Sequence, residues 1–233
     1  MKTLIVGDIH GCWDEFAALL EGAALGANDE IISVGDMVDR GPGSPRVLDF
    51  FRETPNARAI MGNHERKHVR AAKGETDPAQ SQIITGLQFG DDYSAALEYM
   101  ESLPAYLQLD EVDMVHGFFE PRVALEDQRP TVIIGTMSGE TYLQKLFGDR
   151  PWYEFYDGDK PLVVGHRNYL AAPLPLIYPS PSDARVYGLD TGCVYGGALT
   201  GLILPDFRLI SVPSRANHWQ ALQDQYGWLG DDS

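Results

Sequence analysis

The stretch Gly35-Asp36-Met37-Val38-Asp39-Arg40-Gly41-Pro42 directly follows a strand-like run from Glu30 to Val34. Glycine and proline end regular structure, so the strand is expected to give way to a loop here. Loops at strand ends are where binding and catalytic sites are built. Within this loop one of Asp36 and Asp39 can bind a metal while the other orients a neighbouring group, and the Arg40 guanidinium suits phosphate oxygens. We therefore place the centre of the protein at this stretch.

The same change from strand to polar loop occurs on both sides of it. Thr3 to Val6 runs into Gly7-Asp8-Ile9-His10-Gly11, and Ala57 to Met61 runs into Gly62-Asn63-His64-Glu65. A pattern of apolar or charged residues at helical spacing follows each loop. Three strand-helix repeats within the first 73 residues predict a parallel sheet with right-handed crossovers.

Loops that follow parallel strands share the carboxyl edge of the sheet, where open α/β folds bind their ligands. This geometry predicts that the polar residues of the three loops are neighbours: Asp8, His10, Asp36, Asp39, Arg40, Asn63 and His64. Two later strand-like runs, Val112 to Val115 and Leu162 to Val164, also end at histidines, His116 and His166. The sequence thus predicts a cluster of ligand residue types at one edge of the sheet.

Aspartate, asparagine and histidine ligands without thiolates suit Mn²⁺, with Fe or Zn²⁺ as alternatives. A carboxylate between two ligand sets is the usual bridge of a metal pair, and Asp36 is the predicted bridge. Such a pair can hold a phosphate for in-line attack by a hydroxide that bridges the metals. Arg40 would then meet the developing charge, and His64, oriented by Asp39, would donate a proton to the leaving oxygen.

The remainder of the chain gives weaker patterns. We expect one domain over residues 1–233 with a helical insertion at about 74–110, where Tyr93 to Leu103 places Ala96, Leu97 and Met100 on one helical face. The later runs Arg185 to Leu189, Ala198 to Leu204 and Arg208 to Val212 predict an antiparallel second sheet.

The composition limits the classes of function. The 233 residues are 44% hydrophobic, enough to bury a sizeable core, and the net charge is −16. The lysines and arginines do not form a basic stripe, so no nucleic-acid groove is expected. The sequence contains no apolar segment long enough to predict a membrane span. The N-terminus enters a strand directly and shows no signal peptide, so we expect a cytoplasmic protein. Cys12 and Cys193 are expected to be buried thiols, and the sequence does not indicate an oligomeric state.

The three loops together resemble the signature blocks of the phosphoprotein phosphatase family of calcineurin-like metallophosphoesterases. Gly7 to Gly11, Gly35 to Gly41 and Gly62 to Glu65 occur in that family's order. Val115-His116-Gly117 and Gly165-His166-Arg167 resemble its two later histidine ligands. The eukaryotic serine/threonine phosphatases of this family have long middle and C-terminal segments that the chain lacks. It is therefore more similar to the compact bacterial members of the family.

The resemblance implies an α/β/β/α sandwich with two mixed sheets and a dinuclear metal site at the carboxyl edge of the strands. It implies that Asp36 is shared by both metals and that His64 and Asp39 form the acid pair, with Arg40 on the phosphate. The remaining ligands would divide between the two metals, as Asp8 and His10 on one, and Asn63, His116 and His166 on the other.

The implied activity is phosphomonoester hydrolysis, with a bacterial-type serine/threonine protein phosphatase as the first reading. Its substrate would be a phosphorylated protein or a small phosphoester bound by Arg40 and Asn63, with Arg167 or Arg122 as the second arginine. The alternative is a symmetrical diadenosine tetraphosphatase-like or a nucleotide-end phosphatase-like enzyme. That alternative needs further cationic and aromatic contacts, and only scattered candidates exist: Arg122, Lys145, Tyr169 and Arg185.

Two other readings compete with a phosphatase. His64-Glu65-Arg66-Lys67-His68 matches the HExxH pattern of zinc peptidases. It lies at a strand-to-helix junction and would leave Asp8, Asp36 and His166 unexplained, so His68 is expected to be a surface residue. A binding module without catalytic activity is disfavoured because no position of the predicted site is missing. His218, in a polar segment beside Trp219, is also expected at the surface.

Overall fold

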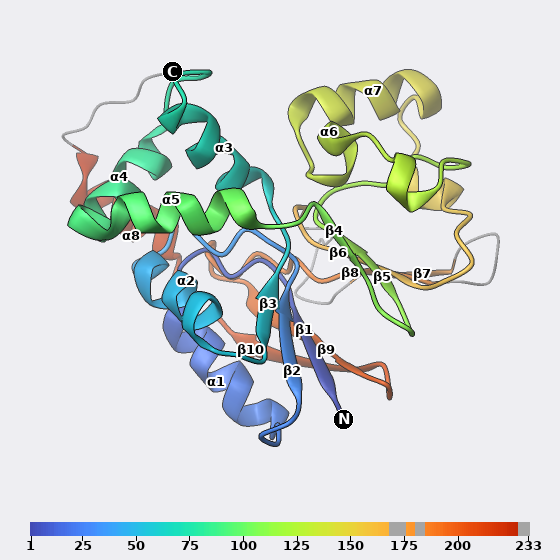
Figure 1. The fold of residues 1–233 in the computed structure, drawn as a ribbon, viewed down its shortest axis with the longest axis horizontal. Helices are drawn as coiled ribbons and strands as arrows, with labels where there is room; N and C mark the ends of the chain where they lie inside the picture. The colour runs from blue at the N-terminus through green and yellow to red at the C-terminus, as the bar shows by residue number, and fades with distance from the viewer. Residues whose placement is uncertain (168–175, 180–184, 228–233) are drawn as a thin grey trace.

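Two five-stranded sheets pack face to face between layers of helices (Figure 1). The computed structural model describes residues 1–167, 176–179 and 185–227. The first sheet has the order β10 (Arg208–Pro213), β9 (Ala198–Leu204), β1 (Thr3–Val6), β2 (Glu30–Ser33) and β3 (Ala57–Ala59). The second has the order β4 (Tyr106–Gln108), β5 (Asp113–Val115), β6 (Leu162–Val164), β8 (Arg185–Gly188) and β7 (Leu176–Pro179).

Most helices lie on the outer faces of the two sheets or above the edge where the loops meet. In chain order the α-helices are α1 (Trp13–Ala23), α2 (Ser44–Glu53), α3 (Asn63–Ala72), α4 (Gln80–Phe89), α5 (Tyr93–Ser102), α6 (Pro130–Ile133), α7 (Met137–Phe147) and α8 (His218–Gln225). Short 3₁₀ turns are η1 (Gly90–Asp92), η2 (Leu125–Asp127) and η3 (Trp152–Phe155). In Figure 1, α1 and α2 lie against the first sheet, and α6 and α7 lie beside the second.

The alternation of side chains along each strand divides the apolar residues among three cores. In β1, Leu4 and Val6 face α1 and α2, whereas Ile5 faces the second sheet. In β6, Leu162 and Val164 join the core under α6 and α7, whereas Val163 packs between the sheets. A layered α/β/β/α sandwich follows from this division, as the sequence resemblance implied.

The first three strands confirm the predicted parallel arrangement, because β1 pairs in parallel with β2 and β2 with β3. The expected antiparallel second sheet is wrong. β9 and β10 pair antiparallel at the edge of the first sheet beside β1, while β8 lies parallel to β6 in the second sheet. Both sheets are therefore mixed. Alternation within a strand shows that it is half-buried but does not identify its partner, so residue patterns could not make this assignment.

The segment between the third strand-loop unit and the second sheet contains α4, η1 and α5. On α5, Ala96 and Met100 are buried as the helical spacing predicts. The end of the proposed insertion, at β4, pairs antiparallel with β5 and so belongs to the second sheet. Tyr169 lies outside the described residues.

Helix α8 changes one prediction from the sequence. His218 at its start is only 16% exposed, and its Nε2 lies 2.9 Å from Oε1 of the buried Glu15 on α1. The expected surface histidine is thus tied to the interior by an ion-pair geometry. As for the membrane, no described helix is both long and apolar enough to cross a bilayer.

The core packing predicts the cost of one truncation. Leu19 on α1 is fully buried in the first core, so Leu19→Ala should lower the free energy of unfolding by about 3 kcal/mol through lost contacts and a residual cavity. Leu87→Ala on α4 is the matched control, because Leu87 is 54% exposed and its truncation should cost within about 0.5 kcal/mol. Urea unfolding of both variants checks this, and equal losses would contradict the assigned core.

Candidate metal centre and active site

The loops after β1, β2, β3, β5 and β6 meet at one place, where the predicted ligand residues come together. Asp36 lies in the middle. Its Oδ2 is 3.6 Å from His10 Nε2, and its Oδ1 is 3.4 Å from His116 Nε2. The Asn63 Oδ1 atom lies 3.1 Å from His116 Nε2 and 2.7 Å from His166 Nδ1. Residues 156 positions apart in the chain, His10 and His166, thereby share one site.

Two clusters of donor atoms share Asp36, one with His10 and His64 and the other with His116 and His166. Asp36 therefore lies between the two clusters, and its role as a bridge stays a prediction. Asp8 is in neither cluster, but its carboxylate accepts hydrogen bonds from the His166 N–H at 3.1 and 3.0 Å. Asp8 thus lies beside the second cluster.

The backbone at the site is held in an uncommon conformation. Five non-glycine residues at the centre have positive φ: His10 at 47°, Asp36 at 51°, Asp39 at 73°, Arg40 at 66° and His166 at 72°. Each left-handed residue of this kind costs about 1 kcal/mol or more and persists only where its surroundings fix it. Their concentration at the ends of three strands marks this edge as a functional site.

Glu65 fixes the loop that carries Asp36. Its buried carboxylate accepts N–H bonds from Asp36 at 2.9 Å, Met37 at 2.8 Å and Val38 at 3.3 Å, and from Gly62 at 3.0 Å. A Cβ on Gly62 would lie 2.2 Å from Asp36 Oδ1, so only glycine fits between the two loops. In the sequence Glu65 had a role only in the peptidase alternative, as the general base of the HExxH pattern.

Backbone carbonyls orient two of the histidines. His10 Nδ1 lies 2.9 Å from the Val38 carbonyl oxygen, and His116 Nδ1 lies 2.8 Å from that of Val34. With Nδ1 donating its proton to the carbonyl, Nε2 of each ring faces Asp36. Metal-bound histidines are commonly fixed in this way. Imidazole nitrogens, a carboxylate and an amide oxygen that converge on one point are ligand atoms of a kind that fits a bound cation.

The protonation states agree with a cation site. Burial lowers the pKa of His10 to about 3, with help from Arg40 and His64, and burial likewise lowers that of His166 to about 3. Burial opposes charge at His116 too, but Asp36 and Asp8 raise its pKa to about 10. Burial and Asp190 raise the pKa of Asp8 well above its usual range. In the protein alone a proton on His116 offsets part of the negative charge of the buried carboxylates. A metal cation can take the place of that proton.

Asp39 connects the centre to helices α3 and α4. Its Oδ2 accepts from His64 Nδ1 at 2.5 Å, and its Oδ1 accepts from His68 Nε2 at 2.8 Å. Burial alone would raise the pKa of Asp39, but the hydrogen bonds from His64 and His68 hold it well below its usual range. His68 is fully buried, so the expected surface position is wrong. The carboxylate therefore orients two histidines, not one.

A family model described as calcineurin-like phosphoesterase matches residues 1–173 of this chain. The chain belongs to the calcineurin-like phosphoesterase family. It is a metal-dependent phosphoesterase, since this family uses dinuclear centres of divalent metals and the chain brings the corresponding donor clusters together.

Relatives of the phosphoesterase span nearly its whole length. The asymmetrical bis(5'-nucleosyl)-tetraphosphatase PrpE of Geobacillus thermodenitrificans (strain NG80-2) is 31% identical over 244 residues, with 94% of this chain and 96% of the relative covered. The protein of the same name from Oceanobacillus iheyensis is 29% identical, with 92% and 93% covered. A crystal structure provisionally named a diadenosine tetraphosphatase has a TM-score of 0.72 and 26% identity, covering 91% of this chain and 93% of that one.

The candidate arginines of the phosphoesterase lie at different distances from the centre. Arg40 Nη1 is 3.3 Å from His10 Nε2, and its guanidinium lies 5.7 Å from the ring centre of Tyr195. Arg167 follows His166 but is ion-paired with Glu140 of α7. Arg122 is exposed and lines a separate pocket with Phe119 and Tyr156, among other residues. The structure thus brings Arg40, but not Arg122, to the donor clusters.

The residues of the HExxH pattern have other contacts in this structure than those of a zinc peptidase site. His64 and His68 both approach Asp39, and Glu65 is saturated by backbone N–H groups, so it is not free to act as a base. Around Asp39 the sequence missed Ser81 and Gln82 of α4, which also hydrogen-bond to its Oδ2, and Tyr93, whose hydroxyl lies 2.7 Å from His68 Nδ1. These side chains reach the site only through packing of α4 and α5, so no sequence spacing indicated them.

The position of His68 predicts the effect of its removal. His68→Ala should lower kcat roughly tenfold or more, because Asp39 loses one of the groups that orient it. His68→Gln should retain more activity, since an amide N–H can replace the bond to Asp39. The measurement is turnover of an aryl phosphate in Mn²⁺, with elemental analysis showing unchanged bound metal.

Lys67→Ala on the same turn of α3 is the control for this experiment, because Lys67 is more exposed than the fully buried His68 and is not among the described residues that hydrogen-bond to Asp39. Normal turnover in a folded His68→Ala variant would refute the role of His68 in orienting Asp39. Loss of a metal from that variant would instead revive a metal-binding role for His68.

Proposed function

We propose that the protein hydrolyses dinucleoside tetraphosphates asymmetrically, adding water across one phosphoanhydride bond to release a nucleoside triphosphate and a nucleoside monophosphate. The observation that carries this proposal is an aromatic pocket that shares a wall with the metal centre. The Phe118 ring lies edge-on to the His166 ring, with 5.1 Å between their centres, and Phe118 also lines the pocket.

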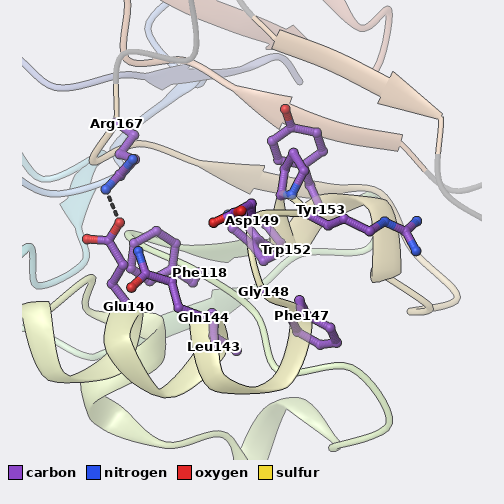
Figure 2. A pocket seen from close by; sticks show the side chains of 12 residues that line it. Phe118, Glu140, Leu143, Gln144, Phe147, Gly148, Asp149, Trp152, Tyr153 and Arg167 are labelled. Carbon is purple, nitrogen blue, oxygen red and sulfur yellow. Dashed lines mark hydrogen bonds and ion pairs between the residues drawn. The ribbon is translucent and has the colours of Figure 1, made fainter.

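The pocket has a volume of about 510 Å³, within the roughly 300–1,000 Å³ typical of small-ligand sites. Figure 2 shows its side chains, which come from α7, the turn after it and η3, together with Phe118 and with Arg167, which follows His166 in the chain. Phe147, Trp152 and Tyr153 provide aromatic surface on which a nucleobase can stack.

One polar atom in this wall lacks a partner. The indole Nε1 of Trp152 is buried and has no hydrogen-bond partner among the described residues. A buried donor without an acceptor costs roughly 1–3 kcal/mol, and a ring nitrogen of a purine could accept its proton. The carboxylate of Asp149 and the amide of Gln144, which also line the pocket, can bond to the exocyclic groups of a base.

This proposal departs from the first reading of the sequence, which placed phosphoserine and phosphothreonine foremost. The relatives that cover nearly the whole chain are named as asymmetrical tetraphosphatases, and this supports the dinucleotide. Two of the residues that the sequence suggested for dinucleotide binding, Arg122 and the exposed Arg185, do not line the aromatic pocket. The aromatic groups instead come from the segment around α7 and η3.

We propose two divalent ions at the centre, Mn²⁺ before Fe or Zn²⁺, because oxygen donors from aspartate and asparagine stand beside the imidazoles. Asp36 would be shared between the ions. The other ligands would be Asp8 and His10 for one ion, and Asn63, His116 and His166 for the other. When bound, the ions supply Lewis acidity at the phosphorus and a nucleophile at neutral pH.

His64 is the proposed general acid. Its Nδ1 bonds to Asp39, which holds the ring so that Nε2 lies 4.0 Å from Asp36 Oδ2, facing the centre. Because Nδ1 is bonded to Asp39, a proton at Nε2 is the one placed to pass to the oxygen that leaves with the departing nucleotide. The second partner of Asp39, His68, limits rotation of the carboxylate.

Three further groups are proposed to bind phosphate. Arg40, beside His10, presents its fork to the oxygens of the reacting phosphate. Asn63 turns its Oδ1 toward the two histidines and leaves its amide hydrogens for a phosphate oxygen. Arg167, between the centre and the aromatic pocket, would contact a phosphate nearer the base.

The substrate experiment compares diadenosine tetraphosphate with a phosphothreonine peptide at one Mn²⁺ concentration. We expect kcat/KM to favour the dinucleotide at least a hundredfold, about 2.7 kcal/mol at the transition state. Chromatography should show ATP and AMP in equal amounts. Release of two molecules of ADP would disprove asymmetrical cleavage. A preference for the peptide would instead support a serine/threonine protein phosphatase.

The pocket is tested separately by Trp152→Phe, which removes the unpaired indole N–H while retaining an aromatic ring. We expect KM for diadenosine tetraphosphate to rise roughly tenfold, which corresponds to the loss of about one hydrogen bond to the base. Turnover of a small aryl phosphate should be unchanged. Trp219→Phe on α8 is the matched control. If KM for the dinucleotide is unaffected by Trp152→Phe, the base does not bind at this indole.

A further inference from the structure

A second group of ligand side chains lies away from the donor clusters around Asp36. Cys12 from the loop after β1, Glu15 from α1 and His218 from α8 place one donor atom each within 4.8 Å of one another. Cys12 and Glu15 are buried, and the His218 side chain is 16% exposed. Cys12 and Glu15 lie close together at the start of α1, and the fold brings His218, 203 residues after Glu15, to the same point.

The Glu15 carboxylate is only half satisfied. Its Oε1 accepts from the Arg215 N–H and faces His218 Nε2, both at 2.9 Å. Its Oε2 is buried and has no hydrogen-bond partner in any other described residue. Burial opposes ionisation of Glu15, but the bonds from Arg215 and His218 lower its pKa, so the unpaired oxygen belongs to a carboxylate anion. An anionic oxygen left unpaired in the interior indicates a missing cationic partner.

We propose that Cys12, Glu15 and His218 form a third metal site that binds Zn²⁺. A thiolate, a carboxylate and an imidazole are all Zn²⁺ ligands, and Zn²⁺ accepts three protein ligands with a fourth position open. One thiolate and one carboxylate neutralise the double charge of the ion, so the site would be buried without net charge. Cys12 Sγ donates a weak hydrogen bond to the His10 carbonyl oxygen at 3.7 Å, and Cys193 is not a member of the cluster.

The site has an approach from the surface. Glu15 and His218 line a pocket of about 230 Å³ together with Asp14, Gly43 and Arg46. The nearby Arg46 guanidinium lies over the Trp13 ring, 4.6 Å from its centre, and Asp14 is ion-paired with Arg215 at 2.8 Å. A metal here would join α8 to the start of α1 and to the loop that carries His10, because Cys12 is two residues beyond it.

Cobalt distinguishes this site from the dinuclear centre. A cysteine thiolate bound to Co²⁺ gives a charge-transfer absorption in the near ultraviolet, and none of the ligands proposed around Asp36 is a cysteine. The experiment adds Co²⁺ to the full chain saturated with Mn²⁺ in reducing buffer. We expect the thiolate band to saturate at one equivalent of Co²⁺ and to disappear when Zn²⁺ is added.

Three variants decide the assignment. Cys12→Ser should abolish the band, and His218→Ala, a change at a partly exposed residue, should weaken Co²⁺ binding at least tenfold in a chain shown by circular dichroism to be folded. Cys193→Ser, the matched control, should retain the band. Absence of the band in the wild-type protein, its survival in Cys12→Ser or unchanged binding in His218→Ala would overturn the proposal.

Discussion

The edge that carries the donor clusters depends on one buried carboxylate, that of Glu65, which accepts hydrogen bonds from the backbone N–H groups of the loop containing Asp36 and of Gly62. Consecutive N–H groups that point inward from a tight turn have no strand or helix partner, so the turn is stable only if an acceptor reaches them. Glu65 stands in the first turn of α3 and supplies that acceptor while capping its own helix. One side chain thus joins the loop after β2 to the loop after β3 and sets the separation of Asp36 and Asn63.

With the loops held in this way, their residues can keep left-handed backbone conformations that would be unfavourable in a free chain. Asp36 then lies among imidazoles whose opposite nitrogens are bound to backbone carbonyls. The result is a preorganised and largely buried set of ligand atoms, around which electrostatic interactions are stronger than in water. The same burial makes an ionised carboxylate unfavourable unless a cation lies beside it. In the protein alone the raised pKa of His116 supplies that positive charge, and the donor clusters are placed so that a metal ion can supply it instead.

The proposed specificity arises outside this preorganised edge. The protein carries a net charge of −16, so its surface as a whole repels phosphates and attraction must be local. Arg40 at the centre and Arg167 at the aromatic pocket provide cationic groups along a short path. A ligand with a base at one end and several phosphates at the other matches an aromatic wall beside a cation site. The proposed zinc site is close to the same loop in the chain, because Cys12 is two residues beyond His10.

The sequence by itself determined the strand-loop-helix units, the residues that the strand ends bring together and the chemistry of the donor set. These features are local, because they depend on residue type, on strand and helix periodicity and on the shared carboxyl edge of parallel strands. Only the tertiary structure assigned β9 and β10 to the first sheet, buried His68 against Asp39, brought Gln82 to the same carboxylate and built the pocket around Trp152. Each of these rests on the packing of elements remote in the chain, and alternation or spacing within an element shows that a side chain is buried without showing which partner it meets.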